Sequence, residues 1–279
     1  MKRITSVILL SVIISFITYG QDFTMPVLSP NAKIWQQFST SFISVDYSRP
    51  SVRNRIIFGD IVPFDKPWRT GANASTKLTF GEDVNFGGTE VKAGTYSLYT
   101  IPNSKEWTVI LNKELDITNA ANFKTENDVA RLKIQSLKSD KKIETLTISI
   151  DNITTNSANL NLTWENTSIT IPIIADNKAK ILAYLEKELN KTNPIYQRAA
   201  NYYLEENYNL DNALIYINKA IEGNPDAYWL YWTKASIYAK MNNQTEAIKI
   251  GEIALEKAKV SGAGDEYQKK LNELKDSFK

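Results

Sequence analysis

The chain has 279 residues, with 33 Lys and Arg against 31 Asp and Glu and a formal net charge of +2. It contains no histidine and no cysteine, which excludes histidine- and cysteine-dependent nucleophilic catalysis, disulfides and the usual zinc and iron sites. It lacks the basic excess that nucleic-acid binding requires, and it is long enough for two hydrophobic cores.

Residues 1–20 are predicted to be a secretory signal peptide. Lys2 and Arg3 precede an apolar run from about Val7 to Ile17, and a polar break follows. The run is shorter than the roughly 18 to 20 apolar residues that cross a bilayer, so an uncleaved anchor is the less favoured alternative. We expect cleavage near Gly20, giving a periplasmic or secreted chain without a transmembrane segment. Because residues 1–20 carry two basic and no acidic residues, the remainder is electrically neutral.

Residues 21–174 are predicted to form an all-β antiparallel sandwich. Thr145–Ile150 and Asn159–Trp164 alternate apolar and polar residues, a period of two that is typical of strands with one solvated face. Phe86–Thr89 carries two adjacent glycines, which favour a tight hairpin. Short strands at close spacing, with a helical pattern only around Ala120, favour a sandwich or a barrel.

Residues 175–279 are predicted to be all-α. Helices are expected at Lys178–Leu189, Tyr196–Glu206, Leu210–Glu222, Ala227–Met241, Thr245–Val260 and Asp265–Lys279. A self-comparison gives a period of 34 residues, in which Ala213 aligns with Ala247 and Ala220 with Ala254. This period and its small positions resemble the tetratricopeptide repeat, a helix–turn–helix unit. An unrelated helical bundle is the alternative.

The β region also carries a long, ordered set of motifs. They are Val45–Ser51, Arg55–Gly59, Val62–Pro63, Trp68–Asn73, Thr76 and Ala93–Leu98. In these motifs the chain resembles domain-of-unknown-function family 2911, from about Ser29 to Ile174. The resemblance implies an exported bacterial protein, in some members with helical repeats behind the β domain. It implies no known activity, substrate or cofactor.

The motif residues offer the chemistry of a ligand site. The residues predicted to bind a small ligand are Tyr47, Arg49, Arg55, Trp68, Arg69, Asn73 and Thr76. The arginines are planar donors for a carboxylate or phosphate, and the aromatic rings offer faces for a sugar or a guanidinium. Alternatively the motif is structural. Arg69 would then pair with Asp46 or Asp65, while Trp68 fills the core and Asn73 makes only an Asx turn.

Catalysis, if present, would depend on carboxylates. The loop and strand carboxylates are Asp46, Asp60, Asp65, Glu82 and Asp83. A glycosidase needs two carboxylates at a set separation across one bond, which sequence alone does not reveal. Gly81–Asn85 lacks the alternating oxygen ligands of a calcium loop. We expect no catalytic residue, metal or cofactor, and the alternative is a carboxylate-dependent hydrolase acting on envelope sugars or esters.

The helical region supplies a second candidate site. In the repeat alignment, Arg198 and Tyr202 of one unit face a concave groove. Trp229 and Trp232 join them from the next unit. Aromatic and arginine side chains are typical anchors of binding interfaces, although these rings would alternatively pack against the β domain or a neighbouring helix.

The sequence therefore predicts an exported, non-enzymatic binding or scaffold protein of the bacterial cell envelope. Its repeats would hold a protein or peptide partner, and its β domain a small anionic or sugar ligand. A purely structural β domain is the further alternative.

Overall fold

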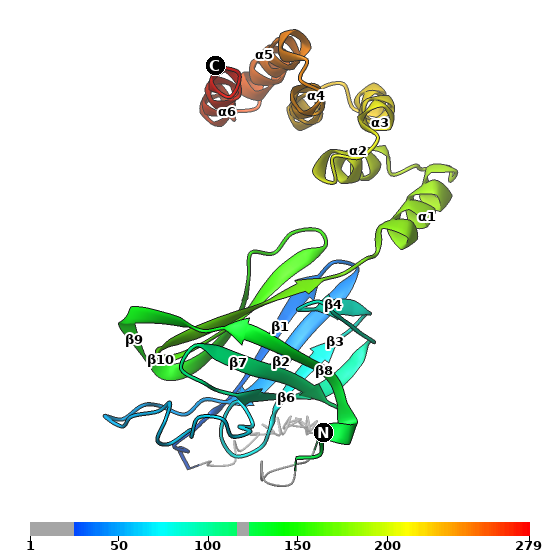
Figure 1. Ribbon diagram of the computed structural model, residues 1–279. Helices are drawn as coiled ribbons and strands as arrows, with labels where there is room; N and C mark the ends of the chain where they lie inside the picture. Colours follow the sequence, from blue (N-terminus) through cyan, green and yellow to red (C-terminus); the bar gives the residue numbers. More distant parts are fainter. Residues whose placement is uncertain (1–24, 116–122) are drawn as a thin grey trace, which may run out of the picture.

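The computed structural model describes residues 25–115 and 123–279, and its strands precede its helices (Figure 1). The predicted signal peptide and the region around Ala120 lie outside the described residues. The strands are β1 (Asn31–Phe38), β2 (Ser41–Ser48), β3 (Thr76–Phe80), β4 (Val84–Phe86), β5 (Thr89–Val91), β6 (Gly94–Ile101), β7 (Glu106–Asn112), β8 (Asp128–Gln135), β9 (Leu137–Asp151) and β10 (Ser157–Ile174). The helices are α1 (Lys178–Leu189), α2 (Tyr196–Glu205), α3 (Leu210–Gly223), α4 (Tyr228–Lys240), α5 (Gln244–Val260) and α6 (Gly264–Asp276).

The described strands form two antiparallel sheets that enclose one hydrophobic core. One sheet has the order β1-β2-β3-β6-β7-β8 and the other has the order β5-β4-β10-β9. Leu78 and Leu111 of the first sheet and Leu162 and Ile173 of the second are almost fully buried in the shared core. Along the first half of β10 every second residue is buried, as the period of two requires. The predicted antiparallel sandwich is confirmed.

The predicted two-glycine hairpin joins β4 to β5, with Val84 opposite Val91. Gly87 and Gly88 both have positive φ angles, +57° and +97°. A Cβ atom on Gly87 would also lie 2.5 Å from Cδ1 of Leu132, on strand β8 of the opposite sheet. Glycine is therefore required here both for the turn and for the close approach of the two sheets.

One corner of the sandwich is closed by a segment that leaves the first sheet and pairs with the second. After β2 ends, Pro50 O accepts a hydrogen bond from Leu146 N (2.9 Å), and Val52 N donates to Glu144 O (2.7 Å). Ser51 forms an isolated antiparallel bridge with Thr145. This pairing covers part of the free edge of β9, which would otherwise present unpaired backbone groups.

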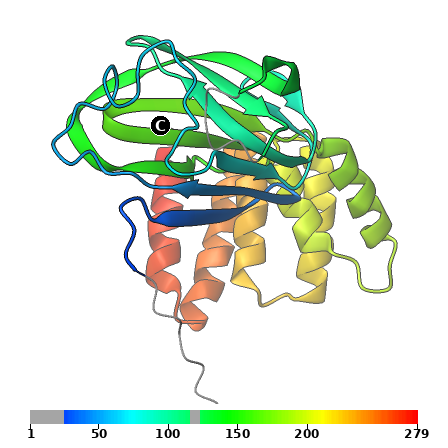
Figure 2. The same ribbon diagram turned by 90° about the horizontal axis from the view of Figure 1, so that it is seen from below.

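The helices follow in sequence and pack on their neighbours, α2 on α3 and α4 on α5 (Figure 2). Figure 2 shows them side by side, from α1 in green to α6 in red. Ala213, Ala247 and Ala254, three of the four small positions of the 34-residue period, are fully buried. The predicted helices are confirmed to within a few residues at each end. Their tetratricopeptide-like character stays a prediction.

A buried carboxylate joins the two domains. Glu82 is 8% exposed, and it accepts hydrogen bonds from the backbone N–H of Thr40 (3.2 Å) and from the Asn177 side chain at the start of α1. Asn177 also donates to Ser39 Oγ (3.2 Å), and Lys180 Nζ donates to Thr40 Oγ1 (3.1 Å). The β1–β2 turn and Glu82 therefore fix the first turn of α1.

We expect Tyr47→Phe to weaken the closed corner. The Tyr47 hydroxyl accepts a hydrogen bond from Ile148 N (3.0 Å) and lies 3.4 Å from Ile148 O, and both residues are buried. Removing it leaves a buried N–H unpaired, so the free energy of unfolding should fall by about 1–3 kcal/mol. Urea unfolding measures the change in free energy. The control is Tyr184→Phe, because the Tyr184 side chain on α1 is exposed. Equal stability of the two variants would contradict the proposed role of the hydroxyl.

Candidate functional site

Tyr47 and Arg49 bridge the two sheets at the closed corner. Arg49 Nε donates to Leu146 O (3.0 Å) and its Nη2 to Thr147 Oγ1 (3.0 Å). Its guanidinium carbon also lies 6.0 Å from the centre of the Tyr47 ring. In the described structure both side chains engage β9, so these two members of the predicted ligand site connect the sheets to each other.

Arg55 and Trp68 stand near the two ends of one long loop. Arg55 Nε donates to Val52 O (3.0 Å), in the same turn. Trp68 stacks on Trp164 with ring centres 5.7 Å apart, and its Nε1 donates to Gly71 O (3.0 Å). Trp68 thus packs against the sandwich core while it also fixes the following loop.

Arg69 and Asn73 belong to that following loop, which folds back onto the end of β2, and Thr76 is the first residue of β3. Thr76 Oγ1 donates to Thr70 O (2.7 Å), and Asn73 Nδ2 donates to Ser48 Oγ (3.2 Å). The Arg69 charge acts on the Tyr99 hydroxyl, on the outer face of the first sheet. The loop and the start of β3 hold Trp68, Arg69, Asn73 and Thr76, whereas the side chains of Tyr47 and Arg49 bond β9 and that of Arg55 bonds Val52 O. Ligand binding by the seven residues stays a prediction.

The predicted groove residues of the helical domain divide into two pairs. Arg198 and Trp229 line one groove of about 450 Å³, together with Tyr196 and Lys219. The groove is formed by the first turns of α2 and α4 and the end of α3, and its lining contains no carboxylate. Lys219 Nζ lies 5.2 Å from the centre of the Tyr196 ring. We call this the cationic groove.

The first turns of two helices, α2 and α4, contribute residues to the lining of the cationic groove. The N-cap residues of α2 and α4 are Ile195 and Ala227, and neither makes a side-chain cap hydrogen bond. By contrast, α3 and α5 are capped by Asn209 and Asn243, whose side chains accept from backbone N–H groups. The uncapped N–H groups carry partial positive charge, so they add to the two cationic side chains.

Tyr202 and Trp232 lie outside the cationic groove. Tyr202 lines a cavity of about 370 Å³ at the domain junction, where it meets Gln36 and Ile153. Trp232 makes an edge contact with Tyr267 of α6, with ring centres 5.7 Å apart. Trp232 therefore packs against a neighbouring helix, and Tyr202 faces the β domain.

A larger cavity, of about 710 Å³, separates α1 from α2 and α3. Tyr203, Tyr208 and Tyr216 line it, with Glu186 as its charged residue. The ring faces are already occupied within the chain, because Tyr203 stacks on Tyr208 at 5.8 Å and Lys178 Nζ lies 3.6 Å from the Tyr208 ring centre. This cavity offers less free binding chemistry than the cationic groove.

Comparison with known proteins assigns the β region. A family model described as "Protein of unknown function (DUF2911)" matches residues 29–173, more than half of the chain. The chain belongs to the DUF2911 family. The predicted resemblance is thereby confirmed, and it carries no assigned activity. The searches of curated proteins and of solved structures gave no match.

The DUF2911 region buries a polar cluster that sequence reasoning missed. Tyr99 is fully buried on the outer face of the first sheet, against Ile110 and the Phe123 ring, whose centre is 5.0 Å away. Ser75 and Ser97 are buried beside it, and their hydroxyls are 2.9 Å apart. All five residues Tyr96–Thr100 are buried, so this part of β6 has no solvated face.

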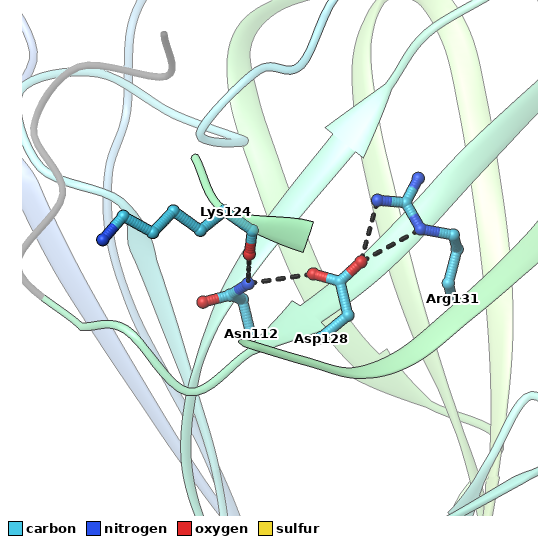
Figure 3. A network of polar contacts seen from close by, with 4 residues as sticks. All are labelled: Asn112, Lys124, Asp128 and Arg131. Carbon is cyan, nitrogen blue, oxygen red and sulfur yellow. Dashed lines mark hydrogen bonds and ion pairs between the residues drawn. The ribbon is translucent and has the colours of Figure 1, made fainter. Parts of the chain in front are cut away.

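A polar network joins the end of β7 to the start of β8 in the DUF2911 region (Figure 3). Asn112, which is fully buried, donates through Nδ2 to Lys124 O (2.9 Å) and Asp128 Oδ1 (2.9 Å). Arg131 donates to Asp128 Oδ2 through Nε (3.0 Å) and Nη2 (2.8 Å). Both Asp128 oxygens are thus engaged within the chain, which indicates a structural network.

Four carboxylates considered for catalysis in the DUF2911 region have partners within the chain. Asp46 accepts from Asn31 (2.8 Å) and Asp65 from Asn103 (2.8 Å), while Glu82 joins the domain junction. Hydrogen bonds from Lys92 and from the Ala93 N–H lower the pKa of Asp83. Within residues 25–115 and 123–279 no group of three acidic side chains is arranged to hold a metal ion. The same residues include no helix long and apolar enough to cross a bilayer.

Stability should decline at alkaline pH partly through Tyr99. Burial raises the pKa of this phenol, and the charge of Glu114 adds to the effect, against the opposing effects of Ser75 and Arg69. Because the folded-state pKa lies above the usual value of 10.0, this contribution is intact below about pH 10 and is lost as the pH rises through the folded-state value.

We therefore expect the difference in unfolding free energy between the wild type and Tyr99→Phe to narrow above about pH 10. Urea unfolding across this range measures it. Tyr184→Phe, which removes a phenol from an exposed side chain of α1, is measured alongside as the control. A gap that stays constant with pH would show that the pKa of the phenol is the same in the folded and unfolded chains, and would contradict the effect of burial.

Proposed function

We propose that this chain is a non-enzymatic binding protein of the bacterial cell envelope whose helical domain holds an acidic segment of a partner protein. The observation that carries the proposal is the cationic groove. Arg198, Lys219 and two uncapped helix N-termini surround a cavity of about 450 Å³ whose lining contains no carboxylate. Such an arrangement favours a carboxylate-bearing ligand.

The aromatic residues of the cationic groove give a ligand more than charge. Trp229 is 42% exposed, although tryptophan is a large apolar side chain, and Tyr196 flanks it in the same lining. Burying a rigid aromatic ring stabilises an interface at little entropic cost, and Trp and Arg are the commonest energetic anchors. An acidic segment with an apolar residue beside its carboxylates would use both features.

The envelope location rests on the predicted signal peptide. Residues 21–279 carry equal numbers of basic and acidic side chains, so there is no overall positive field to attract an acidic partner. Binding of that partner would depend on the local charge of the cationic groove. A partner is therefore selected by the shape and charge of the groove itself. The affinity should fall as salt screens the groove.

The test uses a fluorescent oligoglutamate peptide as probe, with oligolysine as its counterpart, in anisotropy titrations at low salt. We expect the wild type to bind oligoglutamate and not oligolysine. Arg198→Ala combined with Trp229→Ala should weaken binding by about tenfold or more, since both anchors are lost.

The matched control is Lys33→Ala with Trp35→Ala on β1, which removes one cation and one exposed tryptophan from the β domain. It should bind like the wild type. Failure of the wild type to bind oligoglutamate, or equal binding by both double variants, would refute the cationic groove as the site.

A further inference from the structure

The loop between β2 and β3 reaches the end of the sandwich away from the helices (Figure 1), and it carries large apolar side chains that are exposed. Residues 53–66, between the closed corner and Trp68, form a loop in which Ile56 is 65%, Ile61 47% and Phe64 36% exposed. We call these three side chains the loop patch. Ile61 N donates to Ile56 O (3.4 Å), which places these two residues side by side. Exposed apolar residues that lie close together commonly mark an interaction site.

The segment before β1 extends the apolar surface. Met25, Val27 and Leu28 are 70%, 61% and 72% exposed. The Arg53 side chain attaches this segment to the loop, because its Nη2 donates to Leu28 O (3.0 Å). The two segments therefore present their apolar side chains at the same end of the β domain.

The loop holds its shape without a partner. Val62 N donates to Ile57 O (2.9 Å), Gly59 N to Val62 O (2.9 Å), and Phe64 packs over Gly59, where a Cβ would lie 2.9 Å from its ring. Phe58 anchors the loop in the core, with its ring centre 4.8 Å from that of Trp107. An ordered loop that points apolar side chains into water loses little conformational entropy when it binds.

The charges around the loop patch favour one kind of partner. Arg53, Arg55 and Lys66 are exposed in the same loop, against Asp60 and Asp65. Apolar side chains flanked by cations suit the interface of an anionic bilayer, where the apolar groups enter the headgroup boundary and the cations meet phosphates.

We propose that this end of the DUF2911 domain is a peripheral membrane-binding surface, which inserts Ile56, Ile61 and Phe64 among the headgroups of an anionic phospholipid surface. The binding is reversible, because three inserted side chains bury much less apolar surface in the bilayer than a membrane-spanning helix does. The surface is independent of the cationic groove and of the proposed partner binding.

The first test is co-sedimentation of the chain beginning at Gln21, which contains all described residues, with phosphatidylcholine–phosphatidylglycerol vesicles. We expect the wild type to sediment with them at low salt and less with phosphatidylcholine alone. Ile56→Ser, Ile61→Ser and Phe64→Ser together should reduce binding by about tenfold or more.

The matched control replaces three exposed apolar side chains of the helical domain, in Ile215→Ser, Ile253→Ser and Val260→Ser. It should sediment like the wild type. Equal sedimentation of both triple variants, or none by the wild type, would overturn the proposal. Self-association that only the loop substitutions abolish, seen by sedimentation equilibrium without lipid, would also overturn it and assign the surface to a second copy of the chain.

A second measurement does not depend on a triple substitution. The chain contains no cysteine, so Ile61→Cys accepts a polarity-sensitive dye at one position. Its emission should shift to shorter wavelength when mixed vesicles are added, while dye on Val260→Cys should not respond. An unchanged spectrum at position 61 in the presence of bound vesicles would place another surface on the lipid and refute the proposal.

Discussion

The closed corner between the two sheets is the contact on which the rest of the β domain depends. There the chain leaves β2 and pairs with β9, and the Tyr47 hydroxyl joins the backbone of Ile148 across the core. At this corner both the backbone pairing and the buried Tyr47 hydroxyl have hydrogen-bond partners. Pulling the two sheets apart would leave these polar groups unpaired, so the corner resists opening. The same corner sets where the exposed loop begins. Val52 N donates to the backbone of β9, Arg53 N donates to the Glu144 side chain of the same strand, and Val52 O accepts from Arg55. Motif Val45–Ser51, within the region that matches the family, therefore forms the corner from which the loop with the loop patch extends.

A second constraint passes from the sandwich to the helices through Glu82. A buried carboxylate without partners would be costly, and here its partners come from the β1–β2 turn and from Asn177. Because Asn177 is the residue before α1, the direction of the first helix is tied to the sheet. The later helices reach the β domain through few contacts, such as the hydrogen bond between Thr155 and Glu206. The position of the cationic groove therefore depends on the junction and on the packing of α2, α3 and α4 together.

The sequence predicted most of the fold and little of the site, for physical reasons. Strands such as Asn159–Trp164 and the helices have periods that follow from one buried face, and that signal is local. Tyr99 was not predicted to be buried, because nothing in the sequence of β6 shows that Phe123, distant in the chain, packs on the outer face of its sheet. Residues on both sides of β6 are therefore buried. The four predicted groove residues do not share one site, because helical periodicity shows which residues share a face but not what packs against that face. Arg198 and Tyr202 are one turn apart on α2, yet the first lines the cationic groove and the second meets the β domain. Only tertiary packing decides between these neighbours.

The two proposed surfaces lie in different domains and have different chemistry. Away from residues 1–20 the chain is electrically neutral, so neither surface gains from a general positive field. The cationic groove concentrates charge where two helices begin, whereas the loop patch concentrates apolar area with cations around it. Salt should therefore weaken the first more than the second, because an apolar contribution is not screened. Since the loop patch lies at the end of the sandwich away from the helices, a membrane bound there would leave the helical domain accessible to a partner. The same architecture thus permits lipid and partner to be held at once, without a contact between the two surfaces.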